Sequence, residues 1–184
     1  MNYLIFRTDR IGDFLITLPL IKSIKRNNLN AKVFVVTSNK NDEFVKSNKF
    51  VDKTILLKKN NFFKKIKLFL KLKKNKYEAI IVSDKKNRSI ILSLFLTSKK
   101  KIINVSKDFQ KKILGYLYKT VYLDNDDQVN FTIKDVIKKN CNAININLKD
   151  EDYNFFSINE FKDKYNYSEI IDEKKKDYLV FHYD

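Results

Sequence analysis

The sequence has very little glycine, proline, arginine and cysteine. Its 184 residues include two glycines, one proline, four arginines, one cysteine and no tryptophan. The single cysteine, Cys141, excludes an internal disulfide framework and fits a reducing compartment, where we expect it to be a half-buried structural residue. With only Gly12 near the N-terminus, neither the G-x-G-x-x-G loop of dinucleotide-binding proteins nor a Walker loop can be formed there.

Long apolar runs are also absent. No stretch reaches the roughly 18 consecutive apolar residues that a membrane span requires. The N-terminus has no basic region ahead of an apolar segment, so it does not resemble a signal peptide. We therefore expect a cytoplasmic protein, which could also lie at the periphery of the inner face of the cytoplasmic membrane.

The net charge of +16 arises from 38 basic and 22 acidic residues. Such a charge attracts anions, including nucleic acid, anionic lipid and phosphorylated sugars. However, 34 of the 38 basic residues are lysine, which is typical of drift toward A/T-rich codons. Because no helix-turn-helix, RNA-stacking or zinc pattern is found, nucleic-acid binding is disfavoured.

Apolar strands alternate with helices along the first hundred residues, a pattern typical of βαβ units. It predicts an α/β, Rossmann-like parallel sheet with helices on both faces. The strands are expected at Tyr3–Phe6, Lys32–Thr37, Lys53–Leu57, Tyr77–Ser83 and Lys101–Val105. The helices are expected at Asp13–Lys25, Asn41–Ser47, Asn61–Lys74 and Arg88–Thr97, with Pro19 kinking or splitting the first.

The pattern is weaker after Val105. We expect helices at 109–118 and 129–143, with an acidic turn at 124–127 between them. A new apolar run at 177–184 contains His182 and resembles the first strand of a further domain. The predicted organisation is therefore a Rossmann-like domain over 1–145, a linker over 146–176 and the first strand of a missing C-terminal domain over 177–184.

Several of the scarce residues gather in one stretch. The segment Arg7-Thr8-Asp9-Arg10-Ile11-Gly12-Asp13 contains two of the four arginines and one of the two glycines, and the only proline comes soon after, at Pro19. The loop from Thr8 to Gly12 comes directly after the first strand. Ligands of open parallel sheets bind at the carboxyl ends of the strands, so this loop is the candidate site.

Three interpretations of the loop stay open on the residues alone. In the first, Asp13 only caps a helix, Gly12 is a turn residue, and Asp9 and Arg10 form a solvated pair. In the second, helix N-terminal amides hold Asp13 as a base, and Arg7 and Arg10 attract a phosphorylated or carboxylated substrate. In the third, Asp9 and Asp13 bind a metal ion, which the two arginines disfavour.

The pattern R-x-D-R-I-G-D-x-L-x-T-L-P-L-I, from Arg7 to Ile21, resembles the N-terminal signature of the ADP-heptose–lipopolysaccharide heptosyltransferase family, glycosyltransferase family 9. Weaker similarities to this family occur in the expected order at 31–37, 50–52, 76–82 and 128–143. The resemblance therefore extends over nearly the whole chain.

The resemblance implies the N-terminal half of a GT-B glycosyltransferase fold, with 1–145 as the acceptor-side domain. It also implies an inverting, metal-independent and cofactor-free transfer of heptose or a related sugar. The donor would be a nucleotide sugar, ADP-linked in this family, and the acceptor an anionic glycolipid or oligosaccharide of lipopolysaccharide type. By similarity Asp13 is the catalytic general base. The substrate-binding residues implied are Arg7, Thr8, Asp9, Arg10 and Gly12.

The expected nucleotide-sugar domain lies beyond the sequence, so the chain alone is expected to be inactive. Two other functions remain open. A metal-dependent, single-domain glycosyltransferase would use a D-x-D motif, for which 124–126 and 150–152 have the spacing. A non-catalytic module would bind an anionic glycolipid or a membrane surface through the lysine-rich helix at 61–74, although the apolar face of that helix is more simply explained as core.

Overall fold

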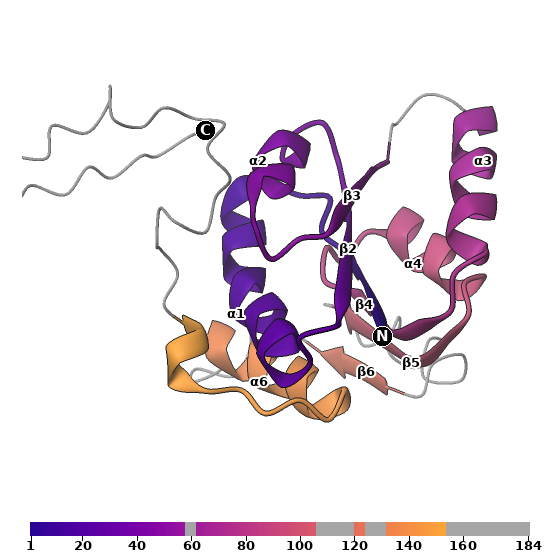
Figure 1. Ribbon diagram of the computed structural model, residues 1–184. Coiled ribbons are helices and arrows are strands. Elements are labelled where there is room, and N and C mark those ends of the chain that lie inside the picture. The colour runs from indigo at the N-terminus through magenta and orange to yellow at the C-terminus, as the bar shows by residue number, and fades with distance from the viewer. Residues whose placement is uncertain (58–61, 106–119, 124–131, 154–184) are drawn as a thin grey trace, which may run out of the picture.

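The structure, a computed structural model, describes residues 1–57, 62–105, 120–123 and 132–153 (Figure 1). Six strands form one sheet in the order β3-β2-β1-β4-β5-β6. Every neighbouring pair in it is parallel. The strands are β1 (Asn2–Phe6), β2 (Lys32–Thr37), β3 (Lys53–Leu56), β4 (Tyr77–Val82), β5 (Ser98–Val105) and β6 (Thr120–Leu123).

Helices lie on both faces of the sheet, as the alternating pattern predicted (Figure 1). One face carries α1 (Ile11–Asn27), α2 (Asp42–Ser47), α6 (Ile133–Ala143) and the short 3-10 helix η1 (Asp150–Tyr153). The other face carries α3 (Phe62–Lys73) and α4 (Asn87–Leu94). Among the described helices, none combines the length and the apolar character needed to cross a membrane. The Rossmann-like α/β fold predicted from the sequence is confirmed.

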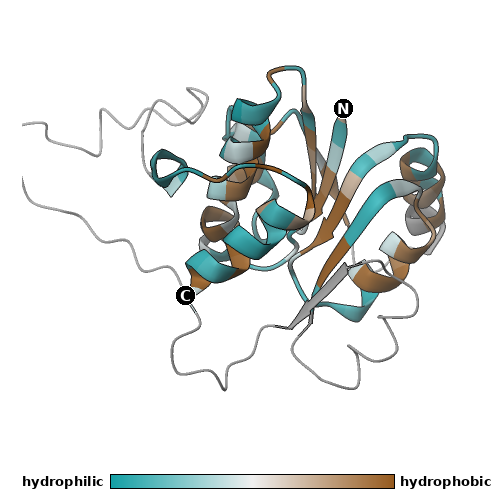
Figure 2. Cartoon of the chain, turned by 90° about the horizontal axis from the view of Figure 1, so that it is seen from below, coloured by the Kyte–Doolittle hydropathy of each residue, from teal (hydrophilic) through white to brown (hydrophobic). Residues whose placement is uncertain are grey.

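Side chains of each strand alternate between two separate cores. Tyr3, Ile5 and Ile81 pack under α1 and α6, whereas Leu4 and Phe6 pack with side chains from α3 and α4. Because both faces are covered, strands such as β2 and β4 contain continuous apolar runs rather than apolar residues at alternate positions. Figure 2 shows apolar strand segments between helices that carry both hydrophilic and hydrophobic residues.

Helix α1 differs from its predicted form at two points. It begins at Ile11 with Arg10 as the N-cap, and the Asp13 carboxylate accepts a hydrogen bond of 3.1 Å from the Arg10 amide. Asp13 therefore lies in the first turn of the helix and is not the N-cap residue. Pro19 does not split the helix, which is continuous to Asn27. Burial of one face of α1 against the sheet outweighs the local cost of the proline.

Other element boundaries shift by a few residues, and β6 is an additional strand. Strand β5 begins at Ser98 instead of Lys101, because its lysine-rich start pairs with β4. Helix α6 begins at Ile133, with Thr132 as its N-cap. The predictions for 109–118, 124–127 and 177–184, His182 included, lie outside the described residues.

The start of the predicted linker is packed against the domain. Within η1, the buried Asp152 carboxylate accepts hydrogen bonds from the Ser23 hydroxyl at 2.7 Å and the Arg26 Nη2 at 2.6 Å. Burial alone would raise the pKa of Asp152, but these bonds and one from the Lys149 amide hold that pKa below its usual range. Residues 146–153 thus belong to the folded domain, and the proposed linker boundary can only lie beyond them.

Cys141 is fully buried beside this contact. Burial raises the pKa of its thiol to about 12, so the thiol stays protonated at neutral pH. The side chain is a structural residue of the core, as expected from the sequence, but it is fully buried rather than half-buried.

We predict that Asp152→Ala lowers the free energy of unfolding by roughly 2–3 kcal/mol, because it leaves Arg26 and Ser23 without their buried acceptor. Urea unfolding measures this change. The control is Glu151→Gln on the same 3-10 helix, where an exposed side chain lies 3.7 Å from Arg26. It should cost less than about 0.5 kcal/mol. If the two substitutions lowered the free energy of unfolding equally, the buried contact of Asp152 with Arg26 and Ser23 would not be the stabilising one.

Candidate functional site

A pocket of about 420 Å³ opens at the carboxyl edge of the sheet. The ends of β1, β4 and β5 and one side of each of α1 and α6 surround it. From β1 the chain passes to β2 on one side, and β4 pairs with β1 on the other side. The pocket therefore lies at the point where the strand order reverses, which is where open parallel sheets bind ligands.

The pocket has two chemically different walls. The polar wall consists of residues that end the three strands or begin α1, namely Arg7, Asp9, Asp13, Ser83, Asp84 and Asn104. The apolar wall consists of side chains from α1 and α6, namely Ile16, Leu20, Ile133, Val136 and Ile137. A sugar ring offers hydroxyl groups around its edge and C–H groups on its faces, and these two walls suit both.

Arg7 joins the elements that form the polar wall. Its Nε donates to the backbone oxygen of Asp13 at 2.7 Å, and its Nη1 donates to the backbone oxygen of Ser83 at 2.7 Å. The same guanidinium lies 3.2 Å from an Asp9 oxygen and 3.9 Å from an Asp13 oxygen. Because the side chain is only 10% exposed, Arg7 holds the two carboxylates from within the protein.

Asp9 is the more enclosed of the two carboxylates, with a side chain 20% exposed. One of its oxygens faces Arg7, and the other is buried with no hydrogen-bond partner among the described residues. Burial raises the pKa of Asp9, the Arg7 charge opposes this, and the Asp13 charge adds to it, with a resulting value of about 6. This carboxyl therefore changes its charge close to neutral pH.

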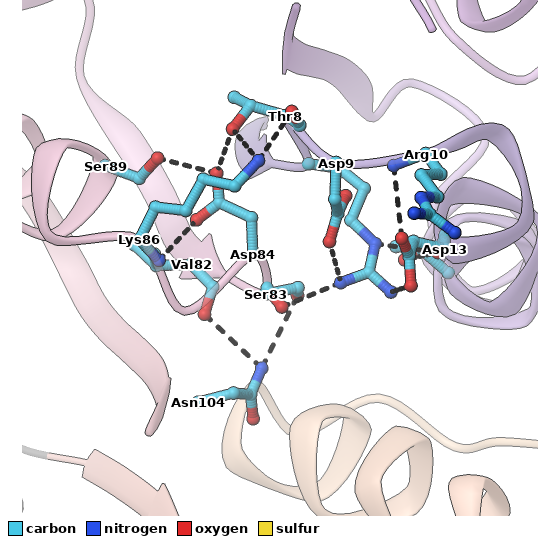
Figure 3. Close-up of polar contacts among 12 residues, drawn as sticks. Thr8, Asp9, Arg10, Asp13, Val82, Ser83, Asp84, Lys86, Ser89 and Asn104 are labelled. Atoms are coloured by element: carbon cyan, nitrogen blue, oxygen red, sulfur yellow. Dashed lines mark hydrogen bonds and ion pairs between the residues drawn. The ribbon is translucent and has the colours of Figure 1, made fainter. Parts of the chain in front are cut away.

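Asp13 is more open, with a side chain 38% exposed toward the pocket (Figure 3). One carboxylate oxygen accepts from the Arg10 amide, and the other faces Arg7. The backbone of the same residue is held by the Arg7 Nε and by the Thr17 hydroxyl, which donates at 3.0 Å. Asp13 is thus a carboxylate on a rigid helical turn, with one side available to a ligand.

The other residues of the predicted site lie around the pocket rather than in its lining. Thr8 is buried, and its hydroxyl donates to Asp84 at 2.6 Å (Figure 3). Arg10 and Gly12 are exposed at the start of α1. A Cβ added to Gly12 would meet nothing within 4 Å. Its backbone does not adopt a left-handed conformation either, so Gly12 is not the turn residue that one interpretation expected.

Sequence reasoning missed the half of the site that comes from β4 and β5. Asp84 lies just after β4 and accepts hydrogen bonds of 2.6 Å from both the Thr8 and Ser89 hydroxyls. Asn104, near the end of β5, donates to the Val82 backbone oxygen at 3.4 Å (Figure 3). The signal available in the sequence was position: each is a polar residue at the carboxyl end of an apolar strand, as Asp9 is after β1.

The metal-binding alternatives gain no support from the described part of the chain. Arg7 lies against both Asp9 and Asp13, in the position where a cation shared by the two carboxylates would have to bind. No group of three His, Cys, Asp or Glu side chains among the described residues could hold a metal ion. Of the two D-x-D candidates, 150–152 places Asp152 in the contact with Arg26, and 124–126 lies outside the described residues.

Comparison with known proteins finds matches only at the level of structure. No family model and no curated protein matches the sequence. The fold resembles E. coli heptosyltransferase WaaC with ADP-2-deoxy-2-fluoro heptose, with a TM-score of 0.65 and 14% identity, over 82% of this chain and 50% of that one.

Two further solved structures are similar. One is E. coli ADP-heptose lps heptosyltransferase II, with a TM-score of 0.59 and 14% identity, over 75% of this chain and 39% of that chain. The other is the glycosyl transferase family 9 protein of Veillonella parvula, with a TM-score of 0.61 and 13% identity, over 81% and 42%. At these identities the likeness establishes the fold, and this chain spans half or less of each of these proteins.

We predict that Asp9→Asn stabilises the protein near pH 8 by about 2 kcal/mol and has little effect near pH 4. Between its usual pKa of 3.8 and about 6, Asp9 is protonated in the folded state and ionised in the unfolded state. Folding then takes up a proton, so the stability of the unmodified protein falls as the pH rises through this window. Urea unfolding of both proteins across the range measures the difference. A difference that is the same at every pH would show that Asp9 titrates normally.

Proposed function

We propose that this chain is the acceptor-binding half of a glycosyltransferase that transfers heptose or a related sugar from an ADP-linked donor to an acceptor of lipopolysaccharide type. The observation that carries the proposal is the place of Asp13. The family-like motif puts this carboxylate on a helical turn at the switch point of the sheet, facing a pocket of sugar size. The shared shape with heptosyltransferases supports the same conclusion independently of the motif.

In the proposed reaction Asp13 acts as the general base. An acceptor hydroxyl donates a hydrogen bond to the carboxylate, and its oxygen attacks the anomeric carbon of the donor sugar. The bond from that carbon to the diphosphate breaks on the opposite side, so the configuration inverts and the nucleoside diphosphate leaves. The hydroxyl proton ends on Asp13, which contributes a factor of about 10²–10⁴ to the rate. No metal ion is needed in this sequence of steps.

Arg7 and Asp9 prepare Asp13 for this role. The Arg10 amide and Arg7 hold the Asp13 carboxylate in one orientation, so little rotational freedom is lost when the acceptor binds. Asp9 contacts the same guanidinium at 3.2 Å, so its charge state near neutral pH changes the field at Asp13. Asp13 is the preferred base because its side chain is 38% exposed, against 20% for Asp9.

The pocket suits hydroxyl groups better than phosphate groups. Asp9, Asp13 and Asp84 line it, whereas its cationic lining residues are Arg7 and Lys85. The Arg7 guanidinium is already engaged by Asp9 and Asp13 and by backbone oxygens. We therefore place the reacting sugar of the acceptor in the pocket, and its anionic groups outside, within reach of the exposed Arg10. This revises the expectation that Arg7 faces the acceptor's phosphates or carboxylates.

The donor would be bound by a second domain. The heptosyltransferases of similar shape are about twice as long as the part this chain matches. Within a two-domain enzyme the nucleotide sugar would approach the pocket from the facing domain. Under this proposal transfer by residues 1–184 alone should be negligible, because the facing domain is what aligns the donor with the acceptor hydroxyl.

We predict that Asp13→Asn lowers the kcat of sugar transfer by about 10²–10⁴, in a protein that joins this chain to its nucleotide-sugar domain. The amide keeps the size of the side chain and cannot take up the proton. Transfer is measured by release of ADP with ADP-heptose as donor and a truncated lipopolysaccharide core as acceptor. The matched control is Glu43→Gln, the same chemical change at an exposed position of α2, which should transfer at the unmodified rate.

The same pair of variants separates catalysis from binding. Acceptor binding to the chain itself, monitored by NMR of the pocket amides, should survive Asp13→Asn with a modest change in Kd. If the acceptor binds but Asp13→Asn and the unmodified enzyme transfer equally well, Asp13 is not the base. If no glycan acceptor binds at the pocket, the proposed function fails as a whole.

A further inference from the structure

The second helical layer, formed by α3 and α4, leaves apolar side chains in solvent. Leu72 of α3 is buried against the sheet, but Ile66 and Leu70 on the same helix are 41% and 53% exposed. On the same side of the sheet, Ile91 of α4 and Phe95 just after that helix are 56% and 63% exposed. The apolar stripe of α3 is therefore wider than the core requires.

The two helices share one continuous surface. The Phe69 ring of α3 packs edge-on against the Phe95 ring, with their centroids 6.1 Å apart. On α3 the helical repeat puts Ile66 and Leu70 in one row, next to Phe69. We call the exposed side chains of Ile66, Leu70, Ile91 and Phe95, together with the exposed lysines of α3, the α3–α4 face. Both helices lie on the side of the sheet away from α1 and α6 (Figure 1).

The charge around these apolar side chains has one sign. The segment from 53 to 77 contains ten lysines and no acidic residue, and the segment from 85 to 107 also has no acidic residue. Lys67, Lys71 and Lys74 form an exposed row next to Ile66 and Leu70. On the first helical layer, by contrast, Asp42, Glu43 and Asp135 lie among the lysines. The charge of the α3–α4 face thus exceeds what uniform lysine enrichment would give.

We propose that the α3–α4 face binds the surface of an anionic phospholipid bilayer. Ile66, Leu70, Ile91 and Phe95 would enter the boundary between headgroups and acyl chains, and the lysine row would contact the anionic headgroups. A second copy of the chain is a poor occupant, because two acid-free basic faces repel each other. The proposal does not depend on sugar transfer. It would place the chain where a lipid-anchored acceptor is available.

The α3–α4 face can be changed without changing the pocket, because none of the described side chains of α3 and α4 lines the pocket. The probe is sedimentation of the 184-residue chain with vesicles of phosphatidylcholine mixed with phosphatidylglycerol, compared with pure phosphatidylcholine. We predict binding to the anionic vesicles that weakens at high salt. Lys67→Gln, Lys71→Gln and Lys74→Gln combined should lower the partition coefficient roughly 100-fold.

The control removes the same charge elsewhere. Lys32→Gln, Lys40→Gln and Lys46→Gln combined replace three exposed lysines outside α3 and α4 and should change binding by less than about threefold. A second variant, Ile66→Ser with Leu70→Ser, should lower binding about tenfold or more and leave the net charge unchanged. Circular dichroism checks that each variant is folded.

Four outcomes would overturn the proposal. These are no binding to anionic vesicles, equal losses from the two lysine triples, no effect of the Ile66 and Leu70 change, and a dimer in sedimentation equilibrium that this change dissociates. The result is independent of the transfer assay. Asp13→Asn should bind vesicles like the unmodified chain, so a failure here and a failure of the glycosyltransferase proposal can be told apart.

Discussion

The polar half of the pocket depends on one buried cation. Arg7 ends β1, and its guanidinium joins the backbone at the end of β4 to the first turn of α1 while it faces Asp9 and Asp13. Without Arg7, the Asp9 and Asp13 carboxylates would lie close together in a partly buried site. Their charges would repel each other, so one carboxylate would become protonated or α1 would move. The planar fork of arginine makes these contacts at once, which lysine could not do. This gives a physical reason for an arginine here in a chain that otherwise uses lysine.

The fold was predictable because both faces of the sheet are covered. Burial on two sides makes strands such as β2 and β4 continuous apolar runs, which stand out in a lysine-rich sequence. Local rules failed where packing overrides them. Pro19 predicted a kink or a break, yet α1 is continuous and is held against the sheet by buried residues on both sides of the proline, namely Phe14, Leu18, Ile21 and Ile24. The apolar run predicted a strand that begins at Lys101, yet pairing with β4 extends the strand back to Ser98.

The site was predictable only where its residues are close together in the chain. Arg7, Asp9 and Asp13 belong to a single loop and first turn, so spacing alone brought them together. Asp84 and Asn104 lie at the same pocket because β4 and β5 follow β1 in the sheet. The order of strands in a sheet cannot be predicted from the pattern of residues along the chain. The sequence also could not show which residues of the loop are available to a ligand. In the structure Arg7 makes hydrogen bonds within the protein, and a side chain at Gly12 would meet open space.

Helix α1 is held by hydrogen bonds at both of its ends, so it links the pocket to η1 on the far side of the domain. Its first turn carries Asp13, and its last turns hold η1 through Ser23 and Arg26. Between Asp13 and Arg26 the helix is a rod of about 20 Å, at roughly 1.5 Å of rise per residue. Any force on η1 is applied to one end of this rod, while the Asp13 carboxylate lies at the other end. Because Phe14, Leu18, Ile21 and Ile24 also bury α1 against the sheet, the positions of η1 and of the Asp13 turn are fixed within one rigid unit.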